Sequence, residues 1–548
     1  MRRIIGIPDT NMFVTEIILY CLLESQANGI VLDKRMIDLG MDSILEFRDK
    51  NFDNDLGIYG FWSQSRNESS NQLFTNSANI LGPLNDLERL MMSPVVGMML
   101  KSLNIDLSNV AAFSNVIKNN FKIPSDNDDT CGNLLLGMKL RNSVNTEIYK
   151  KWEENNQNIK KTIEIITFNS YQPFSKDVKK NVIDSRSYYF VHEFIQDWIS
   201  NGRKQDDFVL PFTWFVDFPL GTNPNAFKTI PTTYNSVDLV VVINTFYALS
   251  TSLIVHGDSI LNQDVERMMR SIIYFFEWGF KSGFVYDRYD VGSVFYPSIY
   301  TFSWSISRVV DFLETQSQTL PNHLPSMLND SLVLLRDIMM NVGTNQILQR
   351  MKSDGNGGVY WEDFLGNADT LQGVKKEYGE DRFYSSALAL NVLIDTWTIT
   401  CGDTVNRRWR DNTPQPVKSA VNNGISYIVE NIFDNPTQTF NAFFDMGERG
   451  PSTQATSYPI NYCYDKIGVE CKFSPSNPEG VVGAVSGVIP DNQYQEMLKM
   501  KWANNTVPTT WSGSFNGSSL VFWSSQPLTY SVSLLALSKS LNIQTLKT

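Results

Sequence analysis

Six stretches of the chain share one pattern, in which a polar or proline-marked start leads into a strongly apolar segment of helical length. Ser, Thr, Asp and Asn side chains accept the free N–H groups of a first helical turn, and proline fits there because it has no N–H to leave unpaired. A helix that is apolar on most sides is buried within a protein. The pattern therefore predicts six buried helices, which begin at Pro8, Pro124, Pro231, Pro297, Gly379 and Gln526.

Helices of a second kind lie between these. In residues 264–279, Val265, Met268, Met269 and Ile272 follow the i, i+3, i+4, i+7 spacing that places apolar side chains on one helix face. Such a helix packs against a core on one side and faces water on the other. The same spacing predicts amphipathic helices over residues 35–50, 187–200, 328–342 and 417–433.

Segments rich in glycine and aromatic residues follow several of the amphipathic helices. Aromatic residues favour strands and glycine favours tight turns, so these segments predict hairpins or folded loops. They cover residues 57–62, 209–218, 283–296, 355–364, 440–447 and 511–523.

This recurring order predicts an all-α fold, an (α/α)6 toroid with six inner and about six outer helices and short aromatic and glycine-containing β-hairpins in the connecting loops. We expect one domain over residues 1–548, with residues 60–90 and 145–186 as its loosest segments. The uneven spacing of the six starts indicates large insertions and excludes a strict solenoid. In a toroid the inner helices run parallel, so their N-termini, with their free N–H groups, meet at one end and build the site there.

The composition excludes several classes of partner. The formal net charge of −12 leaves no basic stripe for nucleic acid or an anionic membrane. No uninterrupted apolar run reaches the roughly eighteen residues of a membrane span, so we expect none. The lack of a clear signal peptide favours a cytoplasmic protein, whereas the Cys463 and Cys471 pair and sequons at Asn67, Asn329, Asn504 and Asn516 fit a secreted one. The oligomeric state is left open.

The segment Asp126-Asn127-Asp128-Asp129-Thr130 is the strongest chemical signal. Clustered carboxylates cannot all ionise cheaply, so one of them keeps its proton and can act as an acid near neutral pH. The alternative is purely structural, because Asp and Thr at a helix start are the residues that N-capping selects.

DNDDT resembles the DxDDT motif of class II terpenoid cyclases, a family built of α/α toroids, and SDGNGGVYW, ending at Trp361, faintly resembles the Gly-Trp repeats of that family. The resemblance implies acid-initiated carbocation cyclisation or isomerisation of a hydrophobic, isoprenoid-like substrate. It implies Asp128 as the general acid, with Asp126 and Asp129 holding its proton, in an aromatic cavity. Candidate aromatic lining residues are Trp62, Trp214, Trp304, Tyr234, Tyr300, Trp361, Tyr384 and Tyr530.

A second hypothesis is a glycoside hydrolase or related carbohydrate-active enzyme that acts on an oligosaccharide through two carboxylates. Its candidates are Asp128 with Glu380 or Asp381, helped by Asp287 or Asp290, with tryptophans as sugar-stacking platforms. A third hypothesis is a non-catalytic ligand-binding or scaffold toroid.

Metal, cofactor and nucleophile chemistry have little support in the sequence. The three histidines, His192, His256 and His323, form no zinc-binding spacing and no catalytic triad motif, so we predict no metal and no cofactor. DNDDTCGNLLLG lacks the spacing of an EF-hand loop. We expect Cys131, which follows the aspartates, to be a small buried residue rather than a nucleophile.

Overall fold

The computed structural model is mostly helical, with a few short strands. It describes residues 10–66, 73–75, 123–143, 145–175, 177–181, 183–215, 235–320, 324–363, 369–371, 374–376, 380–401, 405–445, 499 and 522–544. The prediction of a helical fold is confirmed.

Each of the six predicted apolar segments contains a helix. These helices are α1 (Met12–Ala27), α6 (Asn127–Arg141), α11 (Leu239–His256), α15 (Ile299–Thr319), α18 (Arg382–Trp397) and α21 (Gln526–Leu541). Side-chain caps begin five of them, because Asn11, Asp126, Asp238, Ser298 and Ser525 each accept an N–H of the first turn. The third helix begins after its cap Asp238, several residues beyond Pro231, which lies outside the described residues.

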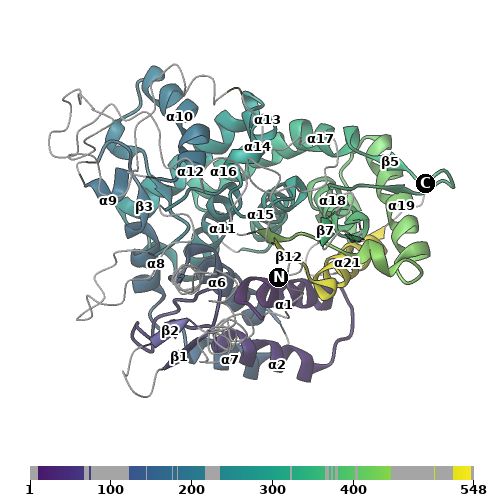
Figure 1. Ribbon diagram of the computed structural model, residues 1–548, viewed down its shortest axis with the longest axis horizontal. Coiled ribbons are helices and arrows are strands. Elements are labelled where there is room, and N and C mark those ends of the chain that lie inside the picture. Colours follow the sequence, from purple (N-terminus) through teal and green to yellow (C-terminus); the bar gives the residue numbers. More distant parts are fainter. Residues whose placement is uncertain are drawn as a thin grey trace, which may run out of the picture.

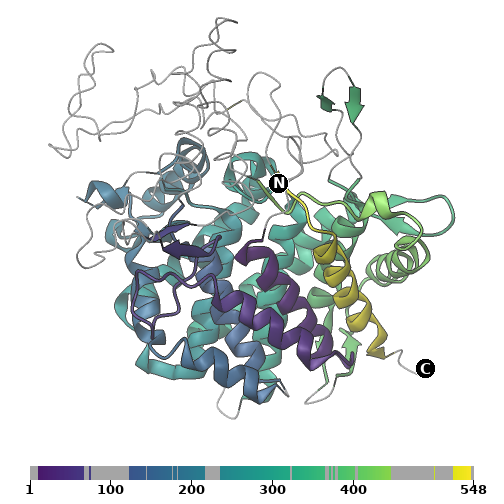
Figure 2. The same ribbon diagram turned by 60° about the horizontal axis from the view of Figure 1, so that its bottom comes forward.

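Contacts link the six helices in a closed cycle. Along the chain each helix contacts the next, and α21 returns to contact α1 (Figure 1). Figure 2 shows α1, in purple, and α21, in yellow, side by side, although they stand at opposite ends of the chain. At the ends of this pair the Asn542 amide donates to the Asn28 carbonyl at 2.7 Å.

The starts of the six helices lie at the same end of the cycle. Near α1, α6 and α15, Phe13 and Asp128 both contact Tyr296. The cap of α11, Asp238, accepts the Phe295 N–H just before α15. The hydroxyl of Ser298, the α15 cap, donates to the Asp363 carboxylate. The Asp363 N–H in turn donates to the carboxylate of Asp381, which directly precedes α18. Phe444 joins Phe13 to Trp523, which precedes α21.

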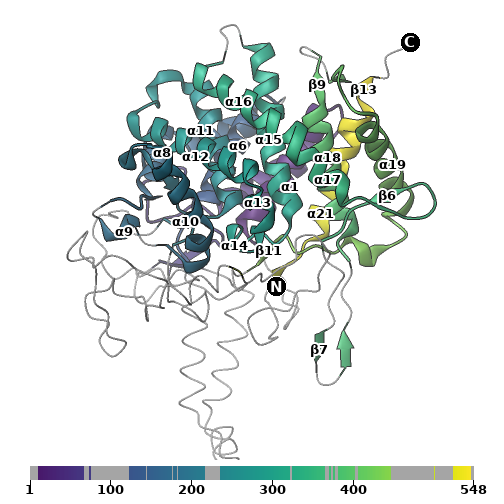
Figure 3. The ribbon, with the colours of Figure 1, turned by 90° about the horizontal axis from the view of Figure 1, so that it is seen from above.

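Amphipathic helices pack against the helices of the cycle or against one another. They are α2 (Lys34–Leu45), α7 (Thr146–Glu154), α8 (Ile159–Phe168), α10 (Ser185–Ser200), α12 (Gln263–Lys281), α16 (Ser326–Ile338), α17 (Thr344–Gln349) and α19 (Gln415–Asn431). A π-helical turn, η3 (Met339–Gly343), joins α16 to α17. Figure 3 shows α8 and α10 at one side of the molecule and α19 at the other. Of the predicted amphipathic segments, 264–279 corresponds to α12, which buries Val265, Met268, Met269 and Ile272.

The strands are short and mostly paired two by two. The antiparallel pairs are β1 (Gln64–Arg66) with β2 (Leu73–Thr75), β3 (Ser170–Tyr171) with β4 (Leu210–Pro211), β5 (Lys352–Ser353) with β6 (Val359–Tyr360), β7 (Asp369–Leu371) with β8 (Val374–Lys376), and β11 (Phe444–Asp445) with β12 (Phe522–Trp523). A three-stranded sheet joins β9 (Thr398–Thr400), β10 (Arg407–Trp409) and β13 (Ile543–Gln544). The β5–β6 hairpin turns through Gly355 and Gly357, whose φ angles of +87° and +100° favour glycine.

Residues 283–296, predicted as a hairpin or a folded loop, do not form a hairpin. They hold two short helices, α13 (Phe284–Asp287) and α14 (Tyr289–Gly292), and the Tyr289 hydroxyl donates to the carbonyls of Tyr296 and Ser298, which folds the segment back. Residues 145–186, predicted as one of the loosest segments, include α7, α8 and α9 (Val178–Asn181). Ile148 and Trp152, four residues apart, bury one face of α7.

One helix, Leu239–Ser259, is long and apolar enough to cross a membrane by length and composition, and 83% of its most apolar window is buried inside the protein. This burial is consistent with the expectation of no membrane span. Asn329 is exposed at the start of α16, whereas Cys463, Cys471 and the other three sequons lie outside the described residues.

Candidate functional site

The first turn of α6 separates the roles of its aspartates. Asp126 is the N-cap, and its Oδ1 accepts the Asp129 N–H at 2.8 Å. The backbone N–H groups of Phe61 and Asp128 lie near its carboxylate and lower its pKa against the rise caused by burial. Capping is therefore the task of Asp126, and the carboxyl of Asp128 is left for other contacts.

Asp128 points to neighbouring helices instead of its own backbone. Its Oδ1 accepts a hydrogen bond from the Asn244 amide of α11 at 2.8 Å, and its Oδ2 contacts the hydroxyl of Tyr296, just before α15. Burial raises the pKa of Asp128 to about 8, and the nearby carboxylates of Asp126 and Asp238 add to this rise against the opposing hydrogen bond from Asn244. Asp128 therefore holds its proton at neutral pH.

Two more carboxyls complete an acidic cluster, which we define as Glu16, Asp126, Asp128 and Asp129. Burial, followed by the charge of Asp126, raises the pKa of Asp129 well above its ordinary value. No N–H or hydroxyl of the described residues donates to its oxygens, and its partner is the Asp126 carboxyl. Because two neighbouring buried carboxylates repel each other, this pair favours a form in which one carboxyl keeps its proton. Burial, with Asp128 next, likewise raises the pKa of Glu16.

A buried arginine, Arg308, lies next to Asn244, the residue that binds Asp128 of the acidic cluster. The Arg308 guanidinium of α15 donates to the Asn244 carbonyl oxygen at 3.0 Å and lies over the Trp304 ring, 4.4 Å from its centroid, and the Tyr20 ring, at 4.9 Å. Asn244 thus links Arg308 to Asp128, because its side-chain oxygen accepts from Arg308 and its side-chain NH₂ donates to Asp128. Arg308 lies about one turn beyond Trp304 on the same helix, which fixes this stack.

Aromatic rings cover the acidic cluster at the helix starts, and we call them the aromatic cap. They come from separate segments of the chain and pack ring on ring at centroid distances between 4.8 and 6.4 Å. All are buried. The cap consists of Phe13, Phe61, Trp62, Trp214, Phe295, Tyr296, Phe443, Phe444 and Trp523.

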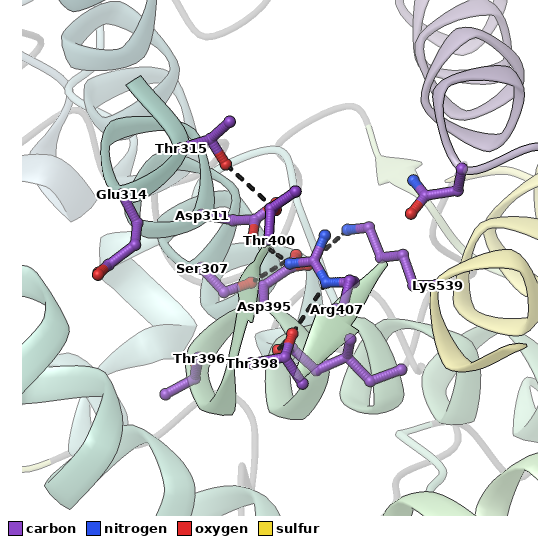
Figure 4. Close-up of polar contacts among 12 residues, drawn as sticks. Ser307, Asp311, Glu314, Thr315, Asp395, Thr396, Thr398, Thr400, Arg407 and Lys539 are labelled. Atoms are coloured by element: carbon purple, nitrogen blue, oxygen red, sulfur yellow. Dashed lines mark hydrogen bonds and ion pairs between the residues drawn. The ribbon is translucent and has the colours of Figure 1, made fainter. Parts of the chain in front are cut away.

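The opposite end of the cycle is closed by ion pairs, which we call the ionic plug. Figure 4 shows Lys539 directed at Asp395, at 2.5 Å, and Arg407 directed at Asp311. A third pair joins Lys139 of α6 to Glu24 of α1. The plug holds three acids and three bases, so its formal charge is zero. The acidic cluster has four carboxyls, of which Glu16 and Asp128 feel the charge of Arg308, and burial favours protonated carboxyls there.

No protein family, no curated protein and no solved structure matches this chain. The function is therefore argued from the geometry of its own residues. Among the described residues, no group of three or more His, Cys, Asp and Glu side chains is arranged to hold a metal ion.

Of the predicted aromatic residues, Trp62 and Trp214 belong to the aromatic cap, and Trp304 stacks on Arg308. Tyr384 is buried with its hydroxyl 3.4 Å from Thr301 Oγ1. Tyr234 lies outside the described residues.

Other predicted residues lie in different surroundings. Trp361 is buried among α17, α18 and α19, where its ring N–H donates to the Ile347 carbonyl. Tyr300 is buried near Asp363, and Tyr530 is partly exposed and stacks on Phe433.

The carboxylates proposed for glycoside chemistry are also distributed over several sets of contacts. Glu380 forms an ion pair with Arg382 at 2.8 Å. Asp381 accepts the Ser385 hydroxyl at 2.7 Å. Asp287 is exposed, and Asp290 is paired with Arg288 at 3.1 Å.

Sequence reasoning missed Glu16, Asn244, Tyr296 and Arg308. Three of them had a signal, since a polar side chain interrupts an apolar helix at Glu16, Asn244 and Arg308. Cys131 is buried as expected, and burial raises the pKa of its thiol, so it is a poor nucleophile.

Proposed function

We propose that the six apolar helices form the inner wall of an (α/α)6 toroid, with the amphipathic helices outside it. The closed cycle of contacts and the common end of the six starts support this arrangement. The ionic plug at one end and the acidic cluster at the other give the two ends different chemistry. In this proposal the site lies at the end where the helices begin.

We propose further that the chain is an enzyme in which Asp128 acts as a general acid on a neutral, hydrophobic, isoprenoid-like substrate, as the resemblance to class II terpenoid cyclases implies. The observation that carries this proposal is a protonated carboxyl held by Asn244 and Tyr296 beneath the aromatic cap. An acid that keeps its proton at pH 7 suits proton transfer to a weakly basic alkene or epoxide. Aromatic faces stabilise the positive charge that follows.

In the proposed step, the O–H bond of Asp128 breaks as a C–H bond forms on the substrate, and the alkene electron pair is consumed in that bond. The new carboxylate keeps its hydrogen bonds from Asn244 and Tyr296, and Arg308 offsets its charge through Asn244. The carbocation ends by losing a proton or by capturing water. A proton kept by Asp126 or Asp129 lies next to Asp128 and can restore its acid form.

The test is Asp128→Asn, assayed with a panel of isoprenoid alkenes and epoxides in D₂O. We expect the parent protein to convert alkenes into cyclised or isomerised products with one deuterium on carbon, and epoxides into cyclised alcohols whose O–D exchanges back to O–H. Mass spectrometry measures both, and the variant should lose at least about a hundredfold in rate. Asp33→Asn, at the exposed cap of α2, is the control, because it makes the same Asp-to-Asn change at a helix start outside the acidic cluster. Undiminished turnover by a folded Asp128→Asn protein would exclude the general-acid role.

Assays of the parent protein with oligosaccharides test the carbohydrate hypothesis. Release of reducing ends from neutral oligosaccharides by the parent protein, with no change to any isoprenoid, would replace our proposal with glycoside hydrolysis. Binding without turnover of either class would favour the non-catalytic toroid.

A further inference from the structure

A half-open groove lies on the outer side of α6, away from the acidic cluster at the start of that helix. It lies between the second half of α6, α7 and the end of α11, and one side of it is open to solvent. Leu134, Met138 and Val255 supply apolar lining, and Tyr149 and Trp152 supply an aromatic wall.

The aromatic wall is held in place by the chain itself. The Trp152 ring N–H donates to the Asn133 carbonyl at 3.0 Å, and Tyr149 stacks on Trp152 at 5.9 Å with an interplanar angle of 22°. Gly137 makes this possible, because a Cβ at that position would lie 2.1 Å from the Trp152 ring. The wall therefore offers a flat surface that does not need to be ordered on binding.

Three polar side chains that line the groove have unused hydrogen-bonding capacity. The Ser252 hydroxyl has no partner among the described residues, although the residue is only 5% exposed. The preceding hydroxyls of Ser250 and Thr251, by contrast, donate to carbonyls one helical turn earlier, at 2.7 and 2.8 Å. Arg141 and His256 end α6 and α11, and no described carboxylate pairs with either.

Arg141 gives this end of the groove a positive charge. Burial, and then the charge of Arg141, lowers the pKa of His256, so its imidazole is neutral near pH 7 and offers a ring N–H as a hydrogen-bond donor. Glu153, the carboxylate that lines the groove, accepts a hydrogen bond from the Tyr149 hydroxyl at 3.1 Å. A bound carboxylate would accept hydrogen bonds from the Arg141 guanidinium, the neutral His256 ring N–H and the Ser252 hydroxyl.

We propose that this groove is a second binding site, for a small aromatic carboxylic acid. The ring of the ligand lies on the wall formed by Tyr149 and Trp152, and its carboxylate meets Arg141, His256 and Ser252. The proposal is independent of the general-acid role of Asp128.

Isothermal titration of the full chain with phenylacetate, and with its neutral analogue 2-phenylethanol, tests the site. We expect phenylacetate to bind at least about tenfold more tightly than 2-phenylethanol, because a charge-assisted hydrogen bond is stronger than a neutral one. Arg141→Gln should remove that preference. Tyr149→Ala should weaken both ligands, since both stack their rings on it.

The matched control is Arg35→Gln, which changes another exposed arginine that no described carboxylate pairs with, on α2. It should bind both ligands as the parent protein does. Equal affinity for the two ligands, an Arg141→Gln variant with parental preference, or no phenylacetate binding at millimolar concentration would each overturn the proposal. The circular dichroism of each variant shows whether it has folded.

Discussion

Asp128→Asn should make the protein more stable at alkaline pH than the parent, by an amount that grows with pH. In the folded state Asp128 is protonated up to a pKa of about 8, whereas its ordinary value is 3.8. Between these values the unfolded chain gains a carboxylate that the folded protein cannot form. Stability linked to this group is therefore fully present below about pH 3.8 and is lost as the pH rises toward 8.

The size of the effect follows from the gap between the two pKa values. Each pH unit changes the free energy of unfolding by about 1.4 kcal/mol for one proton, so the gap of about four units corresponds to a loss on the order of 5 kcal/mol at pH 8. At pH 6 the loss is about half as large. Asparagine fits the same space and does not ionise, so the variant escapes this loss. Its altered hydrogen bonds with Asn244 and Tyr296 add an offset that does not depend on pH.

The assay is urea denaturation of both proteins at intervals from pH 4.5 to pH 8, with the difference in unfolding free energy plotted against pH. We expect a slope of about 1.4 kcal/mol per pH unit in favour of the variant. Asp33→Asn, at the exposed cap of α2, is the control and should give a flat line. A flat line for Asp128→Asn would show that Asp128 is ionised in the folded protein, and the general-acid proposal would fail with it.

Two further predictions concern buried packing and charge, and urea denaturation at pH 7 measures both. Gly132→Ala should destabilise the parent by about 1–3 kcal/mol, because the new Cβ would lie 1.9 Å from a Glu16 oxygen. In a Glu16→Ala background, where that oxygen is absent, the same change should stabilise the protein, because alanine favours a helix more than glycine does; a loss of stability in both backgrounds would contradict this prediction. Lys539→Met should lower the free energy of unfolding by about 3–5 kcal/mol, because it leaves the buried Asp395 carboxylate without its partner. Adding Asp395→Asn should restore much of that free energy; no recovery would mean that Lys539 stabilises the protein by packing alone.

The helices were predictable because their signals are local. Apolar content, capping side chains and the spacing of apolar residues located all six buried helices, and they gave α12 its buried face. The fold of residues 283–296 also has a local cause. Glycine and aromatic residues there suggested a hairpin or a folded loop, and a buried Tyr289 hydroxyl and an Arg288–Asp290 ion pair hold that segment as short helices.

The candidate site was only partly predictable because its contacts join distant segments. The aspartates of α6 were found from their motif. Asn244 and Tyr296, which bind Asp128, lie 116 and 168 residues further along the chain. No local pattern links such positions, and without the fold an asparagine within an apolar helix has no assigned partner. The sequence likewise could not tell which aspartate caps α6, since Asp126 and Asp128 are both suited to that task.

The two ends of the helix cycle show why the acidic cluster is the better candidate for function. Both ends bury charged groups, but the ionic plug pairs each acid with a base, as a structural network requires. The acidic cluster has four carboxyls, only two of which feel the charge of Arg308, and its carboxyls hold protons, which costs stability at neutral pH. Apolar residues of the same volume would avoid that cost, so stability alone does not account for the cluster. A protonated acid beneath aromatic rings is what proton transfer to a hydrophobic substrate requires, and it is the chemistry that Asp128→Asn removes.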